Sequence, residues 1–81
     1  MRENVVELKN LFNSINMPDE ADEIELILSA PLAIIQEEID YLRTLKEQAA
    51  QAERTTEGDT YLMYRHRRQT LTKIMELIYL A

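Results

Sequence analysis

The chain has 81 residues, with 15 Asp or Glu and 9 Lys or Arg, so its formal net charge is −6 at pH 7. This length has room for one small domain over residues 1–81. The absence of cysteine excludes disulfides, thiolate metal sites and cysteine nucleophiles. The acidic balance argues against nucleic-acid binding, which requires a basic surface. Helix-forming residues are common, with one Gly and two Pro, and this composition indicates an all-α fold.

The first helix is predicted over residues 2–14. Val5, Leu8 and Phe12 recur at intervals of three and four residues, which places them on one face of an amphipathic helix. The segment "NSINMPDEADE" then breaks the pattern. We expect Asn16 to cap the next helix, because its side chain can accept a hydrogen bond from an unpaired N–H of the first turn.

The second helix is predicted over residues 17–28, with Pro18 in its first turn, where the missing N–H has no helical partner to lose. Four acids crowd the opening turns, where the helix dipole favours negative charge. The spacing does not fit a calcium-binding loop, which needs alternating oxygen ligands and a glycine. An alternative interpretation is that these acids dock a basic partner; they are Asp19, Glu20, Asp22 and Glu23.

The segment "SAP" marks the second break. Pro31 removes a backbone donor and clashes with the preceding turn, and Ser29 is a candidate cap for a new helix. A third helix is therefore predicted over residues 31–54, with one kinked helix as the alternative. A near-heptad apolar stripe runs along it.

The segment "TTEGD" is the last turn and contains Gly58, which suits a left-handed backbone conformation. A fourth helix is predicted over residues 59–80. The short connection forces the last two helices into an antiparallel pair. The expected fold is a small all-α bundle of three to four helices, dominated by a long C-terminal helical hairpin and dimeric.

The segment "YRHRR" at 64–68 raises the question of a basic site. Five consecutive positions go right round a helix, so the segment is not one basic face. Arg67 falls on the apolar stripe of its helix, where an arginine rarely stays unpaired. We expect it to lie at the bundle edge or to pair across the hairpin with Glu38 or Glu47.

No arrangement of residues indicates catalysis. His66 is the single histidine, and Met63 stands where an ExxH metal motif needs a glutamate. One glycine cannot form a phosphate-binding loop, and no serine has a nucleophile-elbow context. We therefore expect no enzymatic activity, no metal and no cofactor.

The chain carries more apolar surface than a one-faced bundle helix needs. Its last five residues, "LIYLA", cover every side of the helix. For so short a chain, a core shared between two copies is a reasonable solution. The predicted partner-binding residues are Leu77, Ile78, Tyr79, Leu80, Tyr61 and Leu62.

These features predict a non-enzymatic protein–protein interaction module, with an adaptor, chaperone-like or regulatory role, acting as a homodimer. The alternative is an acidic inhibitor that mimics nucleic acid and occupies a basic site on its target. The longest apolar stretch, "IELILSAPLAII", holds Glu25 and Pro31 and is shorter than the roughly 20 residues that span a membrane. We therefore expect a cytoplasmic protein.

Overall fold

A computed structural model describes the backbone of residues 2–80 and the side chains of residues 4–79. Within that range the chain forms four helices and no strand, which confirms the all-α prediction. The helices are α1 (Arg2–Ser14), α2 (Pro18–Leu28), α3 (Leu32–Thr55) and α4 (Gly58–Leu80). None of them is both long and apolar enough to cross a lipid bilayer.

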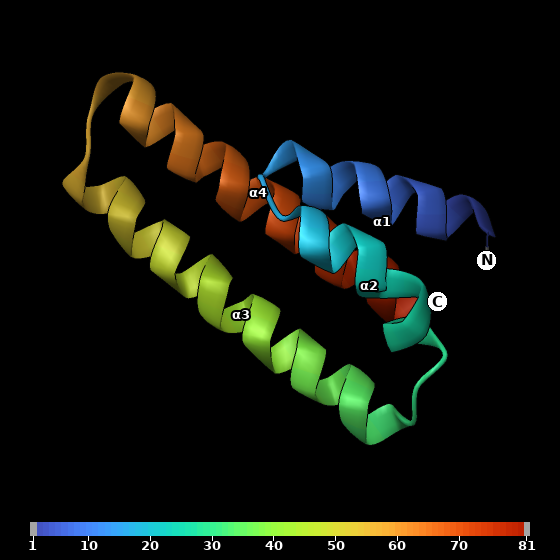
Figure 1. Ribbon diagram of the computed structural model, residues 1–81. Coiled ribbons are helices and arrows are strands. Elements are labelled where there is room, and N and C mark those ends of the chain that lie inside the picture. Colours follow the sequence, from blue (N-terminus) through green and yellow to red (C-terminus); the bar gives the residue numbers. More distant parts are fainter. Residues whose placement is uncertain (1, 81) are drawn as a thin grey trace.

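The molecule is elongated, with extents of 39 × 22 × 20 Å. Helix α4 runs back beside α3, and these two helices share the most extensive contact (Figure 1). Helices α1 and α2 form a second pair, and α1 lies against α4. The contact between α2 and α3 is much smaller, so few side chains hold these two helices together.

The core draws on all four helices. Its largest fully buried side chains are Leu8, Phe12, Ile24, Leu42, Leu71 and Ile74. No side chain between residues 50 and 69 is buried. Most of that part of α3 and α4 projects past the α1–α2 pair (Figure 1), and only its end near Met63 and His66 meets the end of α1 at Ser14. We call residues 50–66 the arm.

The turn between α1 and α2 differs from the prediction, because Asn16 ends α1 and does not cap α2. The N–H of Met17 donates to the carbonyl oxygen of Phe12 at 2.9 Å, and the N–H of Asn16 donates to that of Asn13 at 3.2 Å. This pair of bonds is a Schellman motif, which requires a left-handed residue at the position of Asn16. Asn16 has φ 60°, which asparagine tolerates better than most residues.

The break at Pro31 separates two helices and does not kink a single one. Ser29 lies at the C-terminal cap of α2, where its hydroxyl donates to the carbonyl oxygen of Glu25 at 3.0 Å. It therefore ends α2 and does not start α3, contrary to our expectation. Pro31 is extended, with φ −57° and ψ 154°, and precedes the first turn of α3. Gly58 has φ +64° and opens α4.

Candidate functional site

An apolar groove lies where the end of α2, the start of α3 and the end of α4 meet. It encloses about 560 Å³, and no acidic or basic side chain lines it. Two of its apolar side chains face solvent: Leu32 is 82% exposed and Tyr79 is 62% exposed. The residues that line it are Leu28, Leu32, Ala33, Ile35, Gln36, Ile39, Ile78 and Tyr79. We refer to this set as the apolar groove.

The groove follows from where the helices end. Because α2 stops at Leu28 and Pro31 sets a new direction, no helix covers Leu32 in the first turn of α3. On α4, Ile78 points into the core, with 4% of its surface exposed, so its neighbour Tyr79 points outward. A helix rotates about 100° per residue, which is why consecutive apolar residues here divide between the core and the surface.

The predicted partner-binding residues do not form one surface. Tyr79 lies in the groove, Ile78 belongs to the core, and Leu77 is partly buried against it. The side chain of Leu80 lies outside the described residues. Leu62 is exposed and Tyr61 is half-buried, but both lie near the start of α4. Tyr79 follows Leu62 by 17 positions, which corresponds to roughly 25 Å of helix.

Sequence reasoning did not single out Leu32 as a surface residue. It lies in the segment "PLAII", which is apolar on all sides, a pattern that fits both a monomer core and a core shared between two copies. The pattern that could have identified Leu32 is this apolar character on all sides, because a helix that packs on one side buries only one stripe of its residues.

The acids of α2 divide between solvent and the neighbouring helix. Asp19, Asp22 and Glu23 are exposed, whereas Glu20 is half-buried and interacts with Glu38 of α3. None of these residues belongs to an ion pair among the described side chains.

Glu20 and Glu38 form a carboxyl pair between α2 and α3. Burial raises the pKa of Glu38 to about 8, with further contributions from hydrogen bonding to the Glu20 carboxyl and from the charges of Glu20 and Glu23. One oxygen of each group, Glu20 Oε2 and Glu38 Oε1, is buried and has no hydrogen-bond partner within the described part of the chain. Two carboxylates this close cannot both ionise at low cost, so Glu38 is largely protonated at neutral pH.

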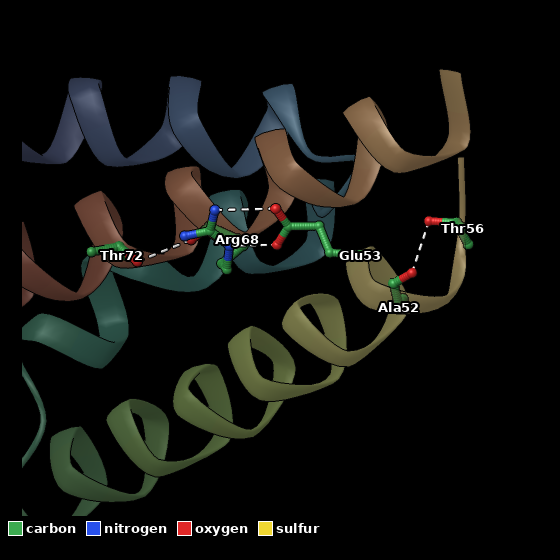
Figure 2. Close-up of polar contacts among 5 residues, drawn as sticks. All are labelled: Ala52, Glu53, Thr56, Arg68 and Thr72. Carbon is green, nitrogen blue, oxygen red and sulfur yellow. Dashed lines mark hydrogen bonds and ion pairs between the residues drawn. The ribbon is translucent and has the colours of Figure 1, made fainter. Parts of the chain in front are cut away.

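The ion pair between α3 and α4 involves Arg68 and Glu53, not the predicted Arg67 (Figure 2). Arg68 Nε donates to Glu53 Oε2 at 2.5 Å, and Arg68 Nη2 donates to Glu53 Oε1 at 3.1 Å. The hydrogen bonds from Arg68 hold the pKa of Glu53 below its usual value. This bidentate geometry is characteristic of strong arginine–carboxylate contacts.

The predicted pairing of Arg67 with Glu38 or Glu47 does not occur among the described side chains. Arg67 is half-buried and lies beside Leu45 and Tyr64 at the edge of the bundle. Glu47 is exposed, and Glu38, two turns before Leu45 on α3, interacts with Glu20. Arg67, on the apolar stripe of α4, therefore packs through the aliphatic part of its side chain. Its neighbour Arg68, on the next face of the helix, makes the ion pair.

Within residues 4–79, His66 does not belong to a cluster of potential metal ligands. His66 is exposed and lines a shallow hollow with Ser14, Met63 and Arg67. No three acidic or histidine side chains among the described residues lie close enough together to hold a metal ion. The apolar groove and the surface over Glu20 and Glu38 are therefore the two features that we consider as functional sites.

The comparison with known proteins gives no family to set beside these two surfaces. No protein-family model matches the chain, and searches of curated proteins and of solved structures find no significant match.

Proposed function

We propose that this protein is a non-enzymatic helical interaction module that associates with a second copy of itself through the apolar groove. The observation that carries the proposal is the exposure of Leu32 and Tyr79 beside an open groove that no charged side chain lines. Contiguous exposed apolar surface of this kind marks interaction sites in soluble proteins.

The energy available supports association. Burying one large apolar side chain stabilises a complex by about 1.5–3 kcal/mol. In a two-fold symmetric interface, each residue contributes twice, once from each copy. The exposed Leu32 and Tyr79 of two copies, with the part of Leu28 and Ile35 that the core leaves uncovered, contribute against the roughly 4–15 kcal/mol that association costs in lost freedom.

A second copy suits the groove for two reasons. The net charge of −6 disfavours contact between two copies over most of their surface, but the groove lining carries no acidic or basic side chain. A chain of 81 residues also buries a modest fraction of its surface alone, and dimerisation is a common way to enlarge the core.

Sedimentation velocity between about 1 and 200 μM tests this proposal, because dimerisation depends on protomer concentration. We expect the wild type to shift from monomer to dimer across this range and the double variant Leu32→Asp/Tyr79→Asp to stay monomeric. Leu62→Asp is the matched control, since Leu62 is also exposed on α4 but lies far from the groove. A wild-type monomer at every concentration, or equal disruption by Leu62→Asp, would refute the proposal.

A second candidate function is an acidic inhibitor that mimics nucleic acid. It is favoured by the exposure of Asp19, Asp22 and Glu23, which pair with no cation among the described side chains. The test is displacement of DNA from a lysine-rich histone by the wild type and by a variant with all four predicted docking acids replaced by amides. Equal displacement by both proteins, or none by either, would end this candidate.

A further inference from the structure

A second hollow lies at the junction of α2 and α3 and shares no lining residue with the apolar groove. It encloses about 270 Å³ and is lined by Glu23, Leu26, Ile27, Ala30 and Ile34. Leu26 is 75% exposed and Ile34 is 44% exposed. The limited contact between α2 and α3 leaves these apolar side chains without a covering element.

Carboxyl groups continue the hollow along both helices. Glu38 lies four residues after Ile34 on α3, and Glu20 lies three residues before Glu23 on α2, so each falls on the same helix face as its neighbour. The buried oxygens Glu20 Oε2 and Glu38 Oε1 have no partner among the described residues. We call the hollow and this carboxyl pair the α2–α3 seam.

The chain provides no cation for the seam from its own neighbourhood. Residues 10–42 contain eight acids and no Lys, Arg or His. The ion pairs of the described side chains lie elsewhere, at Asp40–Arg43, Glu53–Arg68 and Glu7–Lys73. The seam therefore combines exposed apolar side chains with carboxyl groups that pair with no cation among the described side chains. An amphipathic basic helix has the complementary features, which are positive charges beside an apolar face.

We propose that the α2–α3 seam docks an amphipathic basic helix of another protein, with apolar side chains against Leu26 and Ile34 and a Lys or Arg between Glu20 and Glu38. This inference rests on the proposed role as an interaction module, but it does not depend on self-association through the apolar groove. On the bound helix, we expect three to four residues between the apolar positions and the cation. This spacing corresponds to that of Ile34 and Glu38 on α3.

Binding of a basic helix at the α2–α3 seam should change the protonation of Glu38. In the free protein, burial and Glu20 raise the pKa of Glu38 to about 8. A bound cation stabilises the ionised carboxylate and lowers this pKa. Binding near neutral pH therefore releases a proton from Glu38, and affinity increases as pH rises towards 8.

The probe is a synthetic peptide of leucine and lysine, about 18 residues long, with leucines at intervals of three and four so that they form one face. Calorimetric titrations near pH 7 in two buffers of different ionisation enthalpy measure binding and proton release together. We expect one peptide per protein chain and release of about one proton. In Glu38→Gln, proton release should disappear and affinity should fall at least about tenfold; Ile34→Ser should weaken binding but keep proton release.

Two controls separate docking from general charge attraction. A peptide of the same composition in scrambled order has no apolar face. Glu47→Gln/Glu57→Gln replaces two exposed acids elsewhere on the surface and removes at least as much charge near pH 7 as Glu20→Gln/Glu38→Gln, because Glu38 is largely protonated there. Equal binding of the scrambled peptide, or equal weakening by both double variants, would overturn the inference. Loss of peptide binding in Tyr79→Asp would place the peptide in the apolar groove and would also overturn it. Sedimentation of Leu32→Asp/Tyr79→Asp tests self-association separately.

Discussion

The guanidinium of Arg68 on α4 makes two hydrogen bonds to the carboxylate of Glu53 on α3 (Figure 2). The side chain of Glu53 is 11% exposed and that of Arg68 is 33% exposed. The pair lies where the four-helix core gives way to the two-helix arm. Because few apolar contacts hold the arm, this ion pair ties its two helices together at their base.

We expect Glu53→Gln to lower the thermal midpoint at neutral pH, since the variant leaves Arg68 without its carboxylate. The pKa of Glu53 is held low by Arg68, so its contribution is present above the unfolded value of 4.5 and is lost as pH falls through the lower folded pKa. The wild type and Glu53→Gln should therefore converge in acid. Arg43→Gln, which removes an exposed ion pair within α3, is the control and should have little effect.

The second prediction concerns Glu38, whose pH dependence has the opposite sign. Its pKa rises from 4.5 in the unfolded chain to about 8 in the fold, so its contribution to stability is present below 4.5 and is lost as pH rises towards 8. Each pKa unit corresponds to about 1.4 kcal/mol before screening of this half-buried side chain. We expect Glu38→Gln to stabilise the protein by about 1–2 kcal/mol near pH 8.5.

Urea unfolding at a series of pH values measures this effect. The difference in the free energy of unfolding between Glu38→Gln and the wild type should shrink as pH falls and should level off below 4.5, where Glu38 is neutral in the folded and the unfolded chain. Glu37→Gln is the matched control, because Glu37 is exposed on the same turn. An unchanged difference across the whole pH range would show that the gain comes from packing and not from the proton.

The helices were predictable from the sequence because each break has local chemistry that interrupts a helix. Pro18 and Pro31 lack a backbone donor, and Gly58 adopts a left-handed conformation that other residues resist. The expected cap residues were assigned to the wrong helix, however. Asn16 and Ser29 favour caps at either end of a helix, and only the path of the backbone decides which end they occupy.

The candidate sites were less predictable, because they depend on which face of each helix another helix covers. Tyr79 was predicted to be a partner-binding residue and Leu32 was not, yet both are exposed. The interaction of Glu20 with Glu38 joins residues 18 positions apart on two helices whose relative rotation no periodicity fixes. Arg68 and Glu53 lie 15 positions apart on two helices, and the sequence pattern does not identify which acid of α3 the guanidinium contacts.

The third prediction tests the left-handed turn residues. Gly58→Ala should destabilise the protein by about 1–2 kcal/mol, because alanine is strained at a φ of +64° even though no atom lies within 4 Å of the added methyl group. Asn16→Gly should be neutral or slightly stabilising, and Asn16→Ala should be destabilising, since φ there is 60°. Chemical denaturation of the three variants checks this. Equal stability of Gly58→Ala and the wild type would contradict the left-handed conformation at Gly58.

The last prediction concerns the arm, which should open independently of the core. Leu42 is fully buried between the helices of the core, so Leu42→Ala should lower the free energy of unfolding by about 2–5 kcal/mol. Amide hydrogen exchange in segment 71–78 of α4 should become faster by the factor that corresponds to this loss of stability. In the arm, exchange should already be fast in the wild type, and Leu42→Ala should change it little. Local opening of the arm breaks no buried apolar contact of the four-helix core.

Leu62→Ala provides the comparison, since Leu62 is exposed within the arm and its truncation should leave exchange in segment 71–78 unchanged. Glu53→Gln should have the opposite pattern to Leu42→Ala, with faster exchange confined to the arm. If Leu42→Ala accelerated exchange equally in both segments, the arm and the core would unfold as one cooperative unit. The Glu53–Arg68 pair would then stabilise the whole fold, because no separate opening of the arm would exist for it to oppose.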